Sequence, residues 1–538
     1  MSEAAGIGIA PRVWEPGPQA RGDRTARPPA FLIGAALFAA ALVLLPILFT
    51  IVQAASVSMG DAVELLVRPL VGRLLVNTIG LVAAASITCA VIGTAAAWLV
   101  ERTDLPGRKV WAVLAAAPLA IPPFISSYAW VSLSNGLQDF GGALLVVTSA
   151  YYPLVYLPVA AALRGLDPAL EETARSLGQG PWRCFVRVVM PQLRLALLGG
   201  MLLVALDTLI EFGAFALLRF HTFTTELYAQ YRTGLDGPES SLLAVVLIVL
   251  CLVCLFAELK VRGHARYARV GSGARRVARL SRLGRARWPT FLAFVALIGA
   301  TLGVPLGMVG YWLLQHAQAA TAPSAPSLPL LFNATIASIG YGLAGATAAL
   351  MLAAPLGYLT TRYPSRWVVL LERIAYLAQG VPGIVVALAF ISLTVQTMRP
   401  LYQSAALLVI AYAILFLPFA LVSVRAALAQ VPRGLEEAAR SLGLGPIEVA
   451  GRVLAPLTGP GIGAGATLVF VFVATELTAT LLLAPIGTRT LATEVWANTS
   501  SLAFAAAAPY AALMLLISLL STWLLAHRFG AAAFPGQG

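Results

Sequence analysis

Long apolar runs alternate with short polar segments along most of the chain. Each run is about 20 residues or longer, the length that a helix needs to cross a membrane. Strands of a membrane barrel would instead alternate apolar and polar positions over about ten residues, and the runs lack this alternation. The pattern predicts an all-α integral membrane protein with about twelve transmembrane helices, at residues 31–54, 76–99, 110–133, 142–163, 195–218, 241–259, 290–314, 334–360, 367–393, 403–427, 460–484 and 503–526.

Basic residues in the connecting segments predict how these helices are oriented. They gather before the first helix and after every second one, whereas the opposite loops, such as 135–142 and 319–327, contain few. Cytoplasmic loops are the ones enriched in Lys and Arg. We therefore expect both termini to be cytoplasmic, with residues 1–30 as a disordered tail and 260–289 as a basic linker. The run at 31–54 exceeds the 7–15 residues of a signal-peptide core, so we expect it to be retained.

Composition supports the same interpretation. Of the 538 residues, 59% are hydrophobic and 11% are charged, whereas about 25% of a soluble domain is charged. The net charge of +13 would favour nucleic-acid binding in a soluble protein, but here the basic residues lie between apolar runs. Orientation in the membrane and contact with anionic lipid explain them, so no nucleic-acid partner is expected. The cysteines and histidines show no metal-ligand spacing, and we expect this chain to bind no metal or cofactor of its own.

The two halves of the chain repeat each other. The segment L-E-E-T-A-R-S-L-G at 170–178 recurs as L-E-E-A-A-R-S-L-G at 435–443, 265 residues later. Because each copy falls in a set of six predicted helices, the halves enter the membrane in the same direction. We therefore expect two parallel six-helix repeats, residues 31–259 and 290–538, that form one translocation path at their interface.

The repeated segment forms a cytoplasmic loop between the fourth and fifth helices of each half, at residues 165–192 and 430–457. Asp167 suits the N-cap of a helix and Pro168 its first turn, while Gly178 is placed to end it. A second short helix should follow, broken by Pro191 where the next span begins. Such a bent pair could enter a groove on a partner protein and transmit the partner's movement to the membrane.

This loop resembles a known motif. The spacing E-A-A, three residues, G, nine residues, I, one residue, L-P is similar to the coupling loop of ABC importer permeases, with Thr173 and Ala455 as the largest departures. The resemblance implies a type I ABC importer permease of the bacterial inner membrane, with each loop docked on one subunit of an ATPase dimer and a periplasmic binding protein delivering the cargo. The loop residues that it marks are Glu171, Glu172, Ala174, Arg175, Gly178 and Pro191 in the first half, and Glu436, Glu437, Ala439, Arg440, Gly443 and Pro456 in the second.

The chain itself is not expected to be an enzyme. A phosphate-binding loop needs a Gly-Lys-Ser/Thr step, and neither Lys109 nor Lys260 follows a glycine. We therefore expect ATP to be used by a separate ATPase subunit. A secondary transporter can also have twelve spans in two parallel halves, and this alternative stays open, although the paired loops favour the ABC class. No motif supports a membrane enzyme.

Acidic residues and prolines lie inside the predicted spans. Asp207, Glu211 and Glu476 fall in the fifth span of each half, where charges are costly and face the bundle interior, a cavity or a partner. They could line the path or a gate, or form buried hydrogen bonds between spans. Pro122–Pro123 and residues 380–383 interrupt the third span of each half, and of the two interpretations a simple kink is favoured over a broken helix that lines the path.

The cargo is indicated only at the level of a family. Segments in both halves, including 211–218, 223–228, 371–376 and 506–514, resemble the double-length permeases of ferric-iron importers. Permeases for thiamine, aminoethylphosphonate, polyamines and sulfate share much of this architecture. No dedicated iron site is apparent in the sequence, as expected if a binding protein selects the cargo.

Overall fold

The computed structural model describes residues 28–233, 238–263, 280–318 and 326–533. Residues 1–27 of the predicted tail and 264–279 of the predicted linker lie outside this part. Apart from one isolated bridge between Thr103 and Ser281, the regular structure of the described residues is helical. The all-α prediction is therefore confirmed.

The first half contains α1 to α12. Short helices alternate with long ones because polar loops and prolines interrupt the apolar runs. The bounds are α1 (Ala30–Ala55), α2 (Met59–Val67), α3 (Pro69–Arg102), α4 (Arg108–Leu114), α5 (Pro123–Leu133), α6 (Phe140–Gly165), α7 (Pro168–Ser176), α8 (Pro181–Cys184), α9 (Met190–Ile210), α10 (Gly213–Leu217), α11 (Phe223–Arg232) and α12 (Pro238–Gly263).

The second half contains α13 to α24, and from α15 onward its helices follow the order of long and short helices that begins at α3. The bounds are α13 (Arg287–Ile298), α14 (Val304–Gln318), α15 (Leu328–Arg362), α16 (Arg366–Leu377), α17 (Gly383–Thr397), α18 (Ala405–Ala429), α19 (Arg433–Ser441), α20 (Pro446–Val449), α21 (Ala455–Thr475), α22 (Thr478–Leu483), α23 (Leu491–Ser500) and α24 (Phe504–Ala533).

Ten helical stretches of the described chain are long and apolar enough to cross a membrane, and two bent pairs bring the total to twelve. The bent pairs are the predicted third span of each half. They turn by 92° between Ala120 and Pro123 and by 101° between Gly380 and Gly383, so the expectation of a simple kink is wrong. Proline forces the residue before it out of the helical region, and Ile121 and Val381 are both extended.

The predicted fifth spans also differ from the structure. Each was expected to be continuous, at 195–218 and 460–484, but the chain leaves the helix at Glu211 and Glu476, whose backbones are extended. A short helix, α10 or α22, follows each break. These short helices pack on α5 and α17, the helices that follow the breaks in the third spans.

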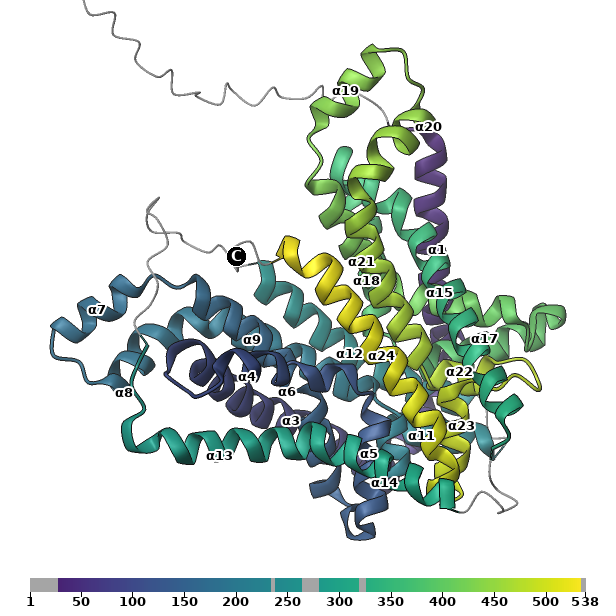
Figure 1. Ribbon diagram of the computed structural model, residues 1–538. Helices are drawn as coiled ribbons and strands as arrows, with labels where there is room; N and C mark the ends of the chain where they lie inside the picture. The colour runs from purple at the N-terminus through teal and green to yellow at the C-terminus, as the bar shows by residue number, and fades with distance from the viewer. Residues whose placement is uncertain (1–27, 234–237, 264–279, 319–325, 534–538) are drawn as a thin grey trace, which may run out of the picture.

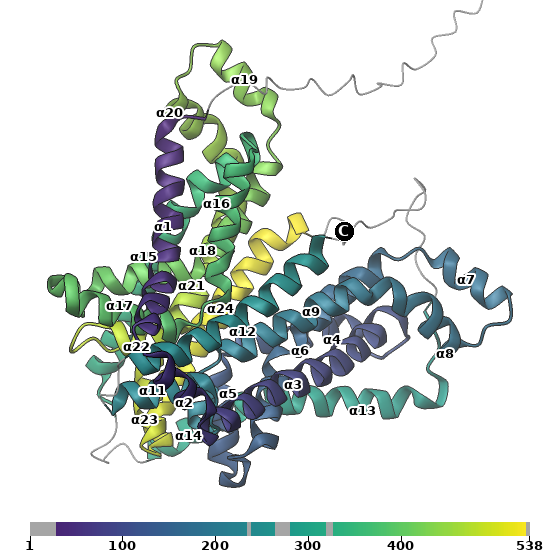
Figure 2. The ribbon, with the colours of Figure 1, turned by 180° about the vertical axis from the view of Figure 1, so that it is seen from behind.

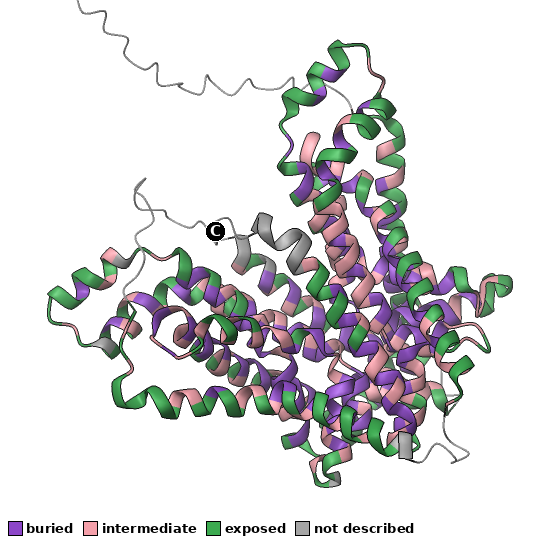
Figure 3. Cartoon of the chain, viewed as in Figure 1, coloured by how far each residue is buried: buried purple, intermediate pink, exposed green. Residues whose placement is uncertain are grey.

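The two halves diverge from a common region. Figures 1 and 2 show α7–α8 and α19–α20 at the far ends of two arms, whereas α5, α11, α14, α22 and α23 gather where the arms meet. Buried residues are concentrated in this meeting region, and much of the outer surface of the arms is exposed (Figure 3). Apolar side chains such as Phe38, Val76 and Leu343 are exposed there, as expected for helices whose solvent is lipid.

The first span of each half packs on the other half. The α1 helix contacts α15, α16 and α17, and Figure 1 shows it beside α15. In return, α14 packs on α5, and Trp111 of α4 stacks edge-on against Phe291 of α13 with a ring separation of 5.6 Å. The first span of each half therefore packs against the other half and stabilises the contact between them.

Candidate functional site

The repeated loop forms two short helices in each half, as predicted. In the first half the Asp167 carboxylate accepts a hydrogen bond from the Ala169 N–H at 3.0 Å, which caps α7. Gly178 and Gly443 have φ of +81° and +87°, and they end α7 and α19 in the left-handed conformation that glycine adopts without strain. Their N–H groups donate to the Arg175 and Arg440 carbonyls, both at 3.0 Å.

Pro191 does not break the helix, contrary to expectation. The helical stretch runs from Trp182 to Ile210, with a π-helical turn at Phe185–Val189 just before the proline. The second half repeats this, with a π-helical turn at Ala450–Leu454 before Pro456. A proline ring clashes with the carbonyl four residues earlier, and the wider turn accommodates it without ending the helix. The second loop helix is therefore continuous with the fifth span.

The outer surface of each loop is apolar as well as charged. Leu177 is 76% exposed and Leu442 is 83% exposed, although leucines at helix ends usually contribute to a core. Exposed apolar side chains occupy equivalent positions 265 residues apart in the two halves. They are Leu170, Leu177 and Trp182 in the first loop, and Leu435, Leu442 and Ile447 in the second.

The two adjacent glutamates of each loop point to different surroundings. Glu172 and Glu437 are exposed. Glu171 instead pairs with Arg102, the last residue of α3, at 3.3 Å, and the side chains are 12% and 4% exposed. Likewise Glu436 pairs with Arg362, the last residue of α15, at 2.6 Å, with exposures of 5% and 8%. Only the second glutamate of each pair is open to a partner.

Other predicted loop residues divide in the same way. Ala174 and Ala439 are buried against the remainder of the loop, whereas Arg175 and Arg440 are exposed. Sequence reasoning missed Arg102 and Arg362, because it interpreted them only as orientation signals. Their position at the end of the second span in both halves was the available signal.

The acids of the fifth spans lie at the breaks. Glu211 accepts hydrogen bonds from the Ala214 N–H at 2.8 Å and from the Tyr151 hydroxyl at 2.9 Å. The Glu476 carboxylate accepts from three backbone N–H groups of the first turn of α22, at 3.0 to 3.2 Å. Each glutamate therefore caps the short helix that follows it.

These two glutamates come from different halves and lie near each other. A Cβ on Gly213 would lie only 2.8 Å from the Leu477 side chain, so α10 and the start of α22 approach closely. The structure thus brings Glu211 and Glu476 to the interface between the halves, whereas Asp207 lies one turn earlier in α9. It does not test whether cargo passes them.

An aromatic cluster, which sequence reasoning missed, lies where the arms meet. Tyr228 of α11 and Trp496 of α23 contact each other with ring centroids 6.2 Å apart, and Phe212 contacts both. The two helices are equivalent in the repeat, since Thr222 with Thr225 and Thr490 with Thr493 form the same capping arrangement. The rings therefore meet at the approximate symmetry axis of the two halves.

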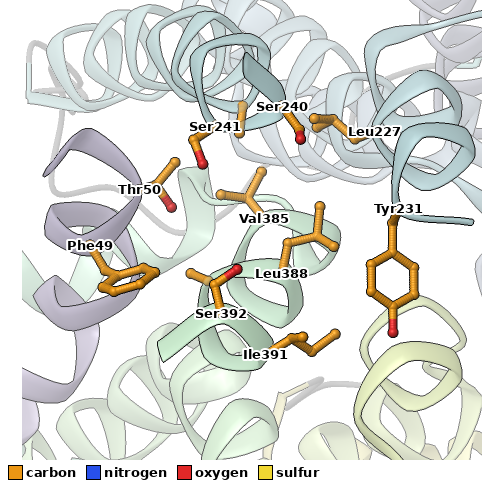
Figure 4. A pocket seen from close by; sticks show the side chains of 12 residues that line it. Phe49, Thr50, Leu227, Tyr231, Ser240, Ser241, Val385, Leu388, Ile391 and Ser392 are labelled. Carbon is orange, nitrogen blue, oxygen red and sulfur yellow. The ribbon is translucent and has the colours of Figure 1, made fainter. Parts of the chain in front are cut away.

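Two cavities adjoin this region. One, of about 30 Å³, lies between α1, α11, α12 and α17, and Figure 4 shows Thr50, Ser241 and Ser392 on its wall. It has room for one or two water molecules. The other, of about 400 Å³, is lined by Arg219, His221 and the rings of Tyr228 and Trp496. Its walls include α11 and α23, which lie where the arms meet and away from α7 and α19 (Figure 1).

Comparison with known proteins identifies the class. A family model described as the inner membrane component of binding-protein-dependent transport systems matches residues 90–260 and again 353–528. The chain is 35% identical over 500 residues to an Fe(3+)-transport system permease protein of Haemophilus influenzae, covering 93% of this chain and 98% of the relative.

Shorter relatives match about one half of the chain. A sulfate transport system permease protein of Escherichia coli is 29% identical over 241 residues, which is 41% of this chain and 87% of the relative. A molybdenum transport system permease protein of the same species is 26% identical over 182 residues, which is 30% of this chain and 79% of the relative. The chain therefore belongs to the family of inner-membrane permeases of binding-protein-dependent ABC importers, with two copies of the permease domain in one polypeptide.

Proposed function

We propose that this chain forms the translocation path of an importer for ferric iron, delivered by a periplasmic binding protein and driven by a dimer of ABC ATPase subunits. The cargo rests on the Fe(3+) permease that matches both halves over nearly their whole length. The sulfate and molybdenum permeases match single halves at lower identity, so their cargoes are the alternatives.

The matched apolar surfaces of the two loops carry the proposal of an ATPase dimer. Leu177 and Leu442 are highly exposed at equivalent positions, and each is followed by an exposed bulky residue, Trp182 or Ile447. Two similar surfaces on one chain suit a partner with two similar subunits. The exposed Glu172 and Glu437 would meet basic or polar groups there.

The proposed orientation places the coupling loops, both termini and the linker at 260–289 in the cytoplasm. Basic residues at the ends of α3 and α15 and in the loops support this placement. Glu211 and Glu476, at the interface of the halves, and Asp207, one turn before Glu211, are the proposed path residues. The aromatic cluster of Phe212, Tyr228 and Trp496 would then close the path at its periplasmic end.

Coupling variants test the role of the loops. Glu437→Lys reverses the charge of an exposed loop residue, and Gly443→Pro removes the left-handed helix end at φ +87°. Both variants should remain in the membrane, and the co-purified ATPase should still bind or hydrolyse ATP. Most of the ATP-driven uptake of radiolabelled ferric iron should nevertheless be lost. Wild-type uptake by both at equal protein amount would contradict the coupling role.

Cargo and energy source are tested on the wild-type chain. Purification through a tag should recover an ATPase, and iron uptake should stop on ATP depletion but survive a proton uncoupler. Uptake that fails only with the uncoupler would indicate a secondary transporter. Uptake of labelled sulfate or molybdate in place of iron would keep the class and change the cargo.

A further inference from the structure

The first loop helix of each half, α7 or α19, is called the coupling helix below. A buried ion pair joins it to the second span of its own half, α3 or α15. Arg102 and Arg362 are the last residues of α3 and α15, and each reaches the first glutamate of the neighbouring coupling helix. All four side chains are at most 12% exposed. Removing one partner of a buried ion pair is strongly destabilising, because the other charge stays buried and unpaired. Each arginine therefore holds its glutamate within ion-pair distance, although the paired Oε1 atoms of Glu171 and Glu436 accept no well-directed hydrogen bond.

The arginines also hold the chain that leads into the coupling helices. The guanidinium of Arg102 donates to the Leu163 carbonyl at 2.9 Å, near the end of α6. That of Arg362 donates to the Val431 carbonyl at 3.0 Å, two residues before α19. Each arginine therefore connects three elements: the second span, the end of the fourth span or the turn after it, and the coupling helix.

The coupling helix and the second span make more polar contacts in the second half than in the first. The Tyr358 hydroxyl donates to Glu436 at 3.0 Å, and Arg440 lies 3.7 Å from the same carboxylate. Arg433 of α19 also donates to the Thr361 carbonyl of α15 at 2.8 Å. In the first half the position equivalent to Tyr358 is Trp98, whose ring has no hydroxyl and contacts Phe185 instead.

We propose that Glu171 and Glu436 are positioning residues that lock each coupling helix to its second span, so that ATPase motion enters α3 and α15 as well as the fifth spans. This inference rests on the proposed docking of an ATPase at the loops. It assigns different contacts to the neighbouring glutamates. Glu172 and Glu437 face the ATPase, whereas Glu171 and Glu436 face the membrane domain. Without the lock, the coupling helix would move while the second span stays behind.

A distance measurement tests the lock directly. Spin labels are placed at Ser441→Cys in α19 and Ala354→Cys in α15, both exposed, in a chain whose four native cysteines are replaced by alanine. The full chain is measured in lipid nanodiscs with its co-purified ATPase, without nucleotide and after trapping with ATP and vanadate. A single narrow distance that is the same in both states is expected, and a shift between states would overturn the proposal.

Glu436→Gln should broaden this distance distribution and make it change with nucleotide, because the neutral amide no longer holds Arg362. Glu372→Gln is the matched control, since Glu372 pairs with Arg425 between α16 and α18 and neither residue belongs to α19. The control should leave the distribution unchanged. An unchanged distribution in Glu436→Gln would also overturn the proposal.

A double variant covers the case in which Glu436→Gln fails to accumulate. Arg362→Met with Glu436→Met removes both charges together, which avoids an unpaired buried charge. It should accumulate and show the same loosened distance, and a wild-type distance would mean that packing alone holds the helix.

Transport efficiency separates positioning from stability. Iron taken up per ATP hydrolysed should fall about fivefold or more in Glu171→Gln and in Glu436→Gln, the scale of a lost coupling interaction. The ATPase should still co-purify, whereas a merely structural role would lower uptake and hydrolysis together. If the wild-type chain recovers no ATPase, the proposed function fails; if the ATPase is recovered and the ratio is unchanged, only the lock fails.

Discussion

Neighbouring residues with the same side chain have opposite surroundings in this protein. In α7 and α19 the first glutamate pairs with an arginine and is little exposed, whereas the second is exposed. The difference follows from helical geometry, since successive residues are rotated by about 100° and only one of them faces the membrane domain. Charge reversal at Glu437 should therefore act on the partner, whereas loss of Glu436 should act within the chain.

At the same scale, the acids at the breaks can be tested one by one. Glu211→Gln and Glu476→Gln keep an oxygen that can cap α10 and α22 but remove the negative charge. If the carboxylates contact a cationic cargo, iron uptake should fall about tenfold, the size of one charge-assisted interaction. Protein amount in the membrane is the control. Normal uptake in both variants would leave the glutamates with the capping role only.

At the scale of elements, close contacts between helices limit the size of the residues at their crossings. Gly200 of α9 lies against the backbone of α6, where an added Cβ would be 2.8 Å from the Val155 Cα. Gly465 of α21, at the equivalent position, lies against the side chain of Ser423 of α18, whose Cβ and Oγ an added Cβ would overlap. Small residues at such crossings allow membrane helices to approach closely.

Gly200→Val should separate α6 from α9 and destabilise the protein by about 1–3 kcal/mol, the usual cost of overpacking. Thermal unfolding of the purified chain in detergent measures the change. Gly199→Val is the matched control, because no atom lies within 4 Å of a Cβ built there. Equal unfolding temperatures for the two variants would contradict the close crossing.

At the scale of the whole molecule, exchange of the first spans makes the two halves depend on each other. Residues of α1, such as Ala36 and Val43, belong to the same buried cluster as Ala346 and Val385 of the second half. The halves therefore share a core and are not joined by the linker alone.

A chain that is split by removing linker residues 264–279 should consequently still assemble. Fragments 1–263 and 280–538, expressed together, should co-purify through a tag on either one. Ala36→Trp should reduce recovery about tenfold, because overpacking the shared core costs about 1–3 kcal/mol. Leu37→Trp is the control, since Leu37 is 53% exposed. Recovery that is equal in both variants would show that α1 does not hold the second half.

Periodicity and spacing in the sequence determined the all-α class, the number of spans, the repeat and the short helices α7 and α19 with their glycine ends. These features depend on local rules: apolar length, basic loops, and the backbone freedom of glycine. The prolines at 122 and 382 also marked the interruptions, although not that the chain turns by 92° and 101°.

Only the tertiary structure decided which residues meet across the chain. Arg102 with Glu171, Tyr228 with Trp496, and α1 with the second half are contacts between segments far apart in the sequence. The breaks at Glu211 and Glu476 belong to this group as well, because a glutamate in an apolar run is compatible with a continuous helix. Hydrophobicity places a helix in the membrane, but side-chain packing and the need to pair buried charges choose its neighbours.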